Sequence, residues 1–172
     1  AAAQRPLHLI GLVSDGGVHS HIDHLFALIR LCHRHQVAAQ LHMITDGRDT
    51  APKAALGYIA RIEDMLAKLG RGHIATVIGR YSAMDRAKHW DRTQRAWAAL
   101  MRGQGFTAGS AREAIEMAYA RGEGDEFIQP TVIAGYRGIA EDESILFFNF
   151  RSDRARQLSA ALGLEEFDAF DR

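Results

Sequence analysis

Four short polar segments carry the residue types that could do chemistry in this chain. Each follows an apolar run directly, and each combines arginine or histidine with carboxylates. Arginine forms paired hydrogen bonds with carboxylates and phosphates, so the segments point to recognition of an anion. They are Ser14 to His21, Asp46 to Thr50, Arg80 to Arg86 and Arg151 to Arg154.

Five arginines in these segments matter most, because a guanidinium keeps its positive charge at neutral pH. Gathering them in one place is unfavourable unless an anion joins them, so we expect a ligand with more than one negative group. The alternative is a set of surface salt bridges to the interleaved carboxylates Asp49, Asp85 and Asp153. The five are Arg48, Arg80, Arg86, Arg151 and Arg154.

Asp49 is the candidate catalytic residue. Its carboxylate, kept ionised by neighbouring arginines, could serve as a general base toward a substrate hydroxyl. The competing interpretation is an N-cap or helix-dipole role at a helix that begins near Pro52. His19 is expected to donate a hydrogen bond to the ligand or to shuttle a proton.

The histidines near the first polar segment could also suggest a metal site, because His-x-His with carboxylates is a ligand pattern. The residues are His19, His21, His24, Asp15 and Asp23. Side chains two residues apart diverge at a helix start, and no remote cysteine or histidine cluster completes a coordination shell. We therefore favour capping and ligand contacts and predict no metal site in this chain. A metal hydrolase that uses His19, His21 and Asp23 is the corresponding alternative function.

The elements that must position these segments alternate along the chain. Nearly continuous apolar runs predict strands that are covered on both faces, at 7–13, 37–45, 73–79 and 144–150. Segments of helical period lie between them, at 22–35, 52–69, 91–102, 111–120 and 153–162. This order predicts a layered α/β/α domain with a mainly parallel central sheet. In such a sheet the ligand crevice lies beyond the carboxyl ends of the strands, so the four polar segments should converge.

Composition excludes several classes of protein. The 172 residues allow one domain with its own core, and 47% hydrophobic with 24% charged residues is an average globular composition. A single cysteine, Cys32, excludes an internal disulfide framework, and no apolar run reaches the length of a membrane helix. Zero net charge without a lysine-rich stripe argues against nucleic-acid binding. We expect a soluble, cytoplasmic protein.

The zero net charge hides two opposite halves. Residues 1–112 hold 15 basic and 8 acidic side chains, a balance of +7, whereas residues 113–172 hold 6 basic and 13 acidic ones, a balance of −7. Arg151 and Arg154 belong to the acidic half yet are expected in the basic site. The halves therefore do not correspond to one positive and one negative face.

Five motifs in order resemble the cofactor-independent, or 2,3-bisphosphoglycerate-independent, phosphoglycerate mutases. The resemblance runs almost from end to end. The motifs are Ser14-Asp15-Gly16-Gly17-Val18-His19-Ser20-His21; Asp46-Gly47-Arg48-Asp49-Thr50; Gly79-Arg80-Tyr81 with Met84-Asp85-Arg86; Asp125-Glu126-Phe127 with Pro130-Thr131-Val132-Ile133; and Phe148-Asn149-Phe150-Arg151-Ser152-Asp153-Arg154.

The resemblance implies a two-domain enzyme of which residues 1–172 form a single domain, the inserted substrate-binding domain. The other domain is alkaline-phosphatase-like and carries a serine nucleophile and two divalent metals, usually manganese. Its Gly-Asn-Ser-Glu-Val-Gly-His motif does not occur in this chain. The implied reaction interconverts 3-phosphoglycerate and 2-phosphoglycerate in glycolysis and gluconeogenesis. We expect the chain alone to be inactive and monomeric, with the metal-binding domain of the same polypeptide as its partner.

The resemblance also assigns roles to residues. The substrate-contacting histidine of the family matches His19, its adjacent pair matches Arg48 and Asp49, and Asp49 would handle hydroxyl protons. The anion-binding arginines match Arg80, Arg86, Arg151 and Arg154. The alternative from another class is a stand-alone module that binds phosphorylated metabolites without catalysis, because a fold does not fix a function.

Overall fold

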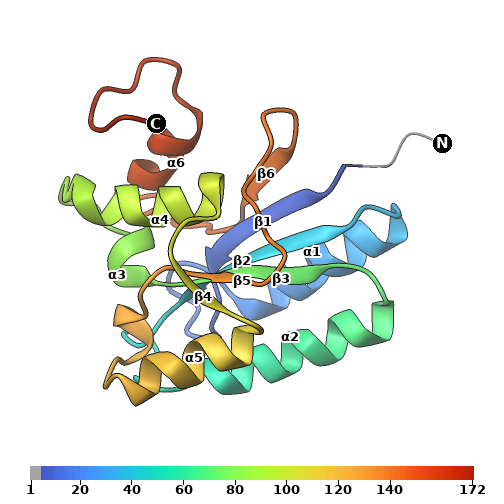
Figure 1. The fold of residues 1–172 in the computed structure, drawn as a ribbon. Coiled ribbons are helices and arrows are strands. Elements are labelled where there is room, and N and C mark those ends of the chain that lie inside the picture. The colour runs from blue at the N-terminus through green and yellow to red at the C-terminus, as the bar shows by residue number, and fades with distance from the viewer. Residues whose placement is uncertain (1–4) are drawn as a thin grey trace.

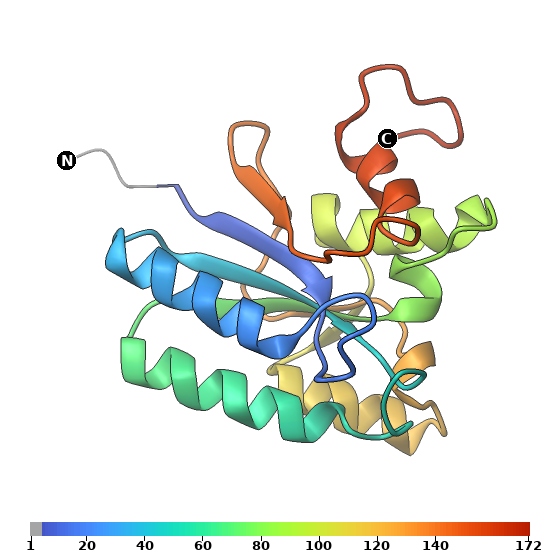
Figure 2. The same ribbon diagram turned by 180° about the vertical axis from the view of Figure 1, so that it is seen from behind.

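The chain forms three layers in a computed structural model that describes residues 5–172 (Figures 1 and 2). A six-stranded sheet is the middle layer, with helices on both faces, as predicted. Its strands are β1 (Leu7–Leu12), β2 (Ala39–Thr45), β3 (His73–Gly79), β4 (Phe106–Ala108), β5 (Thr131–Ile133) and β6 (Ser144–Phe147). The helices are α1 (Ile22–Arg34), α2 (Ala55–Leu69), α3 (Arg80–Ala83), α4 (Trp90–Arg102), α5 (Ala111–Ala120), the 3-10 helix η1 (Asp125–Phe127) and α6 (Arg156–Gly163).

The sheet has the strand order β4-β5-β3-β2-β1-β6 and is mainly parallel. Strand β1 pairs in parallel with β2 and β6, and β2 pairs in parallel with β3. Only the β3–β5 pair is antiparallel among the strands of residues 5–172. The predicted strands are therefore neighbours at the centre and one edge of the sheet, and their carboxyl ends lie on the same side. None of the helices described is long and apolar enough to cross a membrane.

Some predicted boundaries were wrong. Strand β6 ends at Phe147 instead of residue 150, and α6 begins at Arg156 instead of residue 153. Helix α2 begins at Ala55 instead of Pro52, because the buried Asp125 carboxylate accepts hydrogen bonds from the backbone N–H groups of Ala54 and Ala55. The short elements α3, β4, η1 and β5 were not predicted, since three or four residues show no periodicity.

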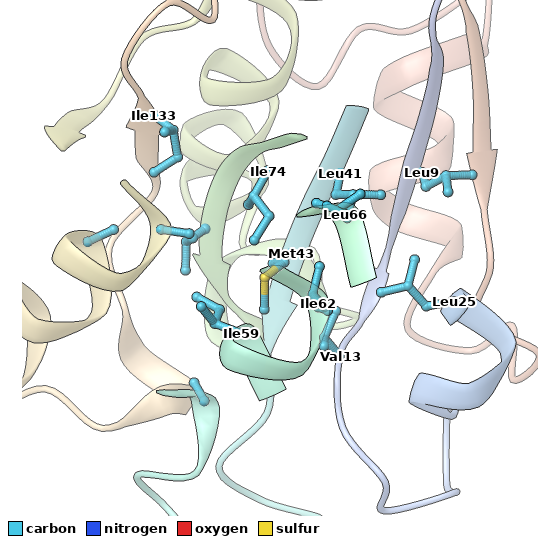
Figure 3. Packing of buried hydrophobic residues seen from close by; sticks show 14 of the residues in the cluster. Leu9, Val13, Leu25, Leu41, Met43, Ile59, Ile62, Leu66, Ile74 and Ile133 are labelled. Atoms are coloured by element: carbon cyan, nitrogen blue, oxygen red, sulfur yellow. The ribbon is translucent and has the colours of Figure 1, made fainter. Parts of the chain in front are cut away.

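Two clusters of buried side chains hold the layers together. The first lies between the sheet and helices α1, α2 and α5, where Ile59 and Ile62 of α2 gather around Met43 of β2 (Figure 3). It includes the single cysteine, Cys32. The second lies under α4 and α6, on the opposite face.

The C-terminal segment closes the second cluster. Phe167 packs edge-on against Trp90, and Phe170 against Trp97, with ring centroids 5.5 and 5.7 Å apart. Trp97 is buried, but Trp90 stays partly exposed. The aromatic pair on α4 therefore holds down the chain that follows α6.

A chain of buried polar groups crosses the sheet at its centre. His8 Nδ1 lies 2.8 Å from His42 Nε2, and both side chains are fully buried. His42 Nδ1 is 3.0 Å from Thr76 Oγ1, and His8 Nε2 is 3.0 Å from Glu143 Oε2. Neutral rings satisfy every one of these contacts: Thr76 donates to His42, His42 to His8 and His8 to Glu143. A proton added to His42 Nδ1 would reverse the contact with Thr76, and one added to His8 Nδ1 would reverse the contact between the two rings as well.

Burial lowers the pKa of His8, against the pull of Glu143, and lowers that of His42 well below 6.5 with help from the charge of a protonated His8. In the unfolded chain both histidines take up protons near pH 6.5. Folding stability should therefore be complete above that pH and fall below it. Urea unfolding should show a loss of up to about 1.4 kcal/mol per pH unit for each histidine between about pH 6.5 and pH 5.5.

The variant His42→Gln should flatten this slope, because one of the two depressed groups is gone. The matched control is His33→Gln, since His33 is exposed at the end of α1. An unchanged slope in His42→Gln would show that the acid sensitivity arises elsewhere.

Candidate functional site

A buried carboxylate ties the polar segments together at the carboxyl ends of the strands. Asp46 follows β2 directly and is 2% exposed. Its Oδ2 accepts a hydrogen bond of 2.6 Å from Ser14 Oγ, after β1, and its Oδ1 accepts one of 2.6 Å from Arg80 Nη1, after β3. The backbone N–H groups of Arg48 and Asp49 also donate to Oδ1, at 3.1 and 3.0 Å. One side chain thus fixes the loops that follow three strands.

Arg80 is buried between two carboxylates. Its Nη1 donates to Asp46 Oδ1 and to Asp49 Oδ2, the latter at 2.7 Å. Burial opposes the ionisation of Asp46, but hydrogen bonds from Ser14, the backbone of Asp49 and Arg80 outweigh it and keep the pKa of Asp46 below its ordinary value. Asp46 and Arg80 therefore form a fixed ion pair at the floor of the site, and Asp49 is hydrogen-bonded to it.

The interpretation of Asp49 as an N-cap was wrong. Its carboxylate contacts Arg80, and the backbone N–H groups at the start of α2 are bound by Asp125. Asp49 is also partly exposed, with 18% of its side chain open to solvent. It is therefore held in place by a buried cation and remains accessible to a ligand.

Two glycines let η1 approach this floor. A Cβ on Gly47 would lie 2.7 Å from the backbone N of Glu126, and the φ of Gly47 is +72°, a region that favours glycine. A Cβ on Gly79 would lie 2.4 Å from the backbone O of Glu126. Thr45 Oγ1 donates to the backbone O of Asp125 at 2.6 Å and fastens η1 to β2. Glu126 therefore reaches the site through close backbone packing.

The last polar segment joins through Asp153. Its Oδ2 accepts a hydrogen bond of 2.7 Å from Arg86 Nη1, and its Oδ1 lies 2.9 Å from Arg151 Nε. His19 Nδ1 is 3.7 Å from Asp153 Oδ1, and within residues 5–172 this buried nitrogen has no hydrogen-bond partner. The pKa of His19 is lowered by burial and by the charges of Arg80 and Arg151, so the ring is neutral at pH 7. A neutral imidazole with a free nitrogen can bind a hydroxyl.

Three of the five predicted arginines line one cavity of about 200 Å³. They are Arg48, Arg80 and Arg154. The cavity is also lined by Tyr81, Met84, Asp85, Arg92, Glu126 and Phe127. Arg154 donates to the backbone O of Met84 at 3.2 Å, and Arg48 lies 3.4 Å from Glu126 Oε1. The walls therefore carry more positive than negative charge.

The arginines of the cavity and those beside Asp153 lie close enough for their positive charges to affect one another. The pKa of Arg154 is lowered by burial and then by the positive charges of Arg86, Arg80 and Arg48. The predicted salt bridges are present as well, since Asp49 and Asp153 each pair with arginine. The arginines are thus both paired and crowded, and the remaining excess of positive charge favours an anion.

The histidines in and after the first polar segment have different structural roles. His21 caps α1, where its side chain accepts a hydrogen bond from the backbone N of Asp23 at 3.2 Å. His24 packs edge-on against Phe150, with centroids 5.7 Å apart. Among residues 5–172 no three His, Cys, Asp or Glu side chains are grouped to hold a metal ion. The capping interpretation is confirmed for His21.

A family model described as BPG-independent PGAM N-terminus (iPGM_N) matches residues 1–172, the whole of the sequence. The chain belongs to this family. The resemblance drawn from the five motifs is thereby confirmed. The family's name also locates the match at the N-terminal part of a larger protein.

Two relatives within this mutase family are identical to the chain at more than half of the aligned positions. The 2,3-bisphosphoglycerate-independent phosphoglycerate mutase of Symbiobacterium thermophilum is 58% identical over 98% of the chain and 33% of its own length. That of Desulforudis audaxviator is 52% identical over 96% of the chain and 34% of its own length. A crystal structure of Leishmania mexicana phosphoglycerate mutase at low cobalt concentration superposes with a TM-score of 0.93 at 30% identity, over 99% of the chain. The chain spans about a third of the length of these relatives.

Three residues that build the site of this mutase-family domain were not predicted from the sequence. Asp46 was noted only as part of its segment, although its position at the end of a strand and before a glycine could have marked it. Asp125 was noted only as part of a motif. Arg92 was placed on a helix and given no role, although it lines the arginine cavity. Their roles depend on contacts between segments far apart in the chain.

Asp46 should matter for stability as well as for binding. Asp46→Ala leaves Arg80 buried with one carboxylate instead of two, and we expect urea unfolding to show a loss of about 3 kcal/mol. The control is Asp64→Ala, which removes an exposed pair with Lys68 at 2.7 Å and should cost about 0.5 kcal/mol or less. Equal losses in the two variants would contradict the central place of Asp46.

Proposed function

We propose that this chain is the substrate-binding domain of a cofactor-independent phosphoglycerate mutase, which interconverts 3-phosphoglycerate and 2-phosphoglycerate. The observation that carries the proposal is the arginine cavity beside a buried histidine and a fixed carboxylate. A phosphoglycerate has two anionic ends and a hydroxyl, which suits this combination. Family membership and the names of the relatives support the same reaction. The relatives' coverage supports a part of a larger enzyme over a stand-alone module.

The arginines would bind and orient the ligand. The cavity is lined by Arg48, Arg80 and Arg154. Beside His19, Asp153 forms ion pairs with Arg86 and Arg151. Bidentate hydrogen bonds from guanidinium groups fix the plane of a carboxylate or phosphate as well as its position. A ligand held at both ends would present its hydroxyl carbons in a defined orientation.

Asp49 and His19 would handle protons and hydroxyls. In the proposed reaction the phosphoryl group leaves one glycerate oxygen for a serine outside this chain and returns to the other oxygen. The first oxygen gains a proton while the serine hydroxyl loses one, and on the return the second oxygen loses a proton while the serine regains one. Asp49 is accessible and held by Arg80, so its carboxylate can take the proton of the attacking second oxygen and pass it on, while neutral His19 orients a hydroxyl.

The metals of the proposed enzyme would lie outside this chain. Within the described part of the chain, no three His, Cys, Asp or Glu side chains are grouped to hold a metal ion. Two divalent ions, manganese in our proposal, would be held by the partner domain together with the serine. We further propose that residues 1–172 act as one domain of a monomeric cytoplasmic enzyme and are inactive alone.

Ligand binding can be tested on the chain itself. Titration with 3-phosphoglycerate in the millimolar range should shift amide NMR signals around Arg151 and Arg154. The binding should be weak, because closure by a second domain is missing. Glycerol is the matched control, since it has hydroxyls but no charge and should leave these signals in place. Unmoved signals with 3-phosphoglycerate would refute the proposed function.

Turnover can be tested in the intact enzyme that contains this chain. Arg151→Ala removes charge-assisted hydrogen bonds and should lower kcat/KM about 10- to 100-fold. Arg112→Ala is the matched control, because Arg112 is half exposed and lies 3.9 Å from Glu63, away from the cavity. Equal effects of the two substitutions would show that the site has been misplaced.

A further inference from the structure

We infer that Arg92 is a further substrate-binding residue, which contacts the anionic end of the ligand that enters the arginine cavity. This inference rests on the proposed function. Arg92 lies in the first turn of α4, an element that carries none of the residues assigned above. Its side chain is 23% exposed and lines the same cavity as Arg48, Arg80 and Arg154.

The guanidinium of Arg92 has donors to spare. Within residues 5–172 it donates no hydrogen bond, and its closest charged partner is Asp85 Oδ1 at 3.5 Å from Nη1. Asp85 is occupied elsewhere, because its Oδ1 lies 3.0 Å from His89 Nδ1 and its Oδ2 accepts a hydrogen bond of 2.9 Å from Gln157 Nε2. A guanidinium has five N–H donors, and leaving them unfilled in a mostly buried place is costly. An anion in the cavity would fill them.

Arg92 is nevertheless held in a fixed position. Its guanidinium carbon lies 4.0 Å from the centre of the Tyr81 ring, a cation–π contact. Tyr81 in turn packs on Phe127, with ring centroids 5.2 Å apart. Both rings line the cavity. The aromatic pair therefore keeps the donors of Arg92 in place before a ligand arrives, which lowers the entropy lost on binding.

Arg92 also differs from the other arginines of the cavity. Arg80 is matched by two carboxylates, Arg48 lies beside Glu126, and Arg154 donates to a backbone carbonyl. Arg92 alone among these four stacks on a ring and donates to nothing in the described chain. It is thus the cation of the cavity with the most hydrogen-bonding capacity left for a ligand.

The test measures binding of 3-phosphoglycerate to the 172-residue chain by NMR. The Arg92 Nε–Hε signal, assigned by its loss in Arg92→Lys, should shift with ligand. Arg92→Ala should raise Kd about tenfold. Arg92→Lys should raise Kd several-fold, to a value between those of the unaltered chain and Arg92→Ala, since lysine keeps the charge but not the paired donors. Thermal unfolding of each variant checks the fold.

The matched control is Arg95→Ala, one turn further along α4. Arg95 is half exposed, and it lines a separate apolar groove with Phe106 and Pro130. Its substitution should leave Kd unchanged. If the unaltered chain binds and Arg92→Ala binds equally well, this inference is wrong while the proposed function stands. If Arg92→Ala changes only the thermal stability, the role of Arg92 is structural. If the unaltered chain does not bind, both fail.

Discussion

The structure of the site depends on the buried ion pair between Asp46 and Arg80. Taking two charges out of water costs several kcal/mol for each ion, and their attraction repays this only if the other hydrogen-bonding positions are filled. Here they are filled by Ser14 Oγ and by two backbone N–H groups on one side and by Asp49 on the other. The positions of the loops after β1, β2 and β3 therefore depend on one another.

That constraint explains how cations can be massed without a ligand. Two carboxylates near the arginines take part in more than one contact: Asp46 accepts from Ser14 and Arg80, and Asp153 pairs with both Arg86 and Arg151. The pairing offsets repulsion enough for the domain to fold, but it does not cancel the charge, because after burial the charges of Arg86, Arg80 and Arg48 also lower the pKa of Arg154. Salt bridging and anion binding, which were alternatives for the sequence, are compatible: the pairs fix the arginines, and the excess positive charge favours an anion.

Local pattern was enough to predict the centre of the sheet and the convergence of the loops that follow its strands. Continuous apolar runs predicted the four parallel strands, and the crevice rule then predicted which loops converge. Features that depend on long-range packing could not be predicted: β4 and β5 have three residues each, and Asp125 reaches the start of α2 across 70 residues or more. His8 and His42 were hidden for the same reason, since a histidine inside an apolar run shows its partner only after the strands pair. Arg92 became visible only as part of a cavity wall.

The opposite charges of the two halves of the chain are explained by this same long-range order. Strand β6, from the acidic half, pairs with β1, and η1 from that half packs beside β2 and β3. Glu143 thereby meets His8, Glu126 meets Arg48, and Asp153 meets Arg86. The basic half supplies most of the site's cations, and the acidic half supplies the carboxylates that hold several of them. Because these pairs form only when β6 and η1 dock, the site's cations are fully positioned only in the complete sheet.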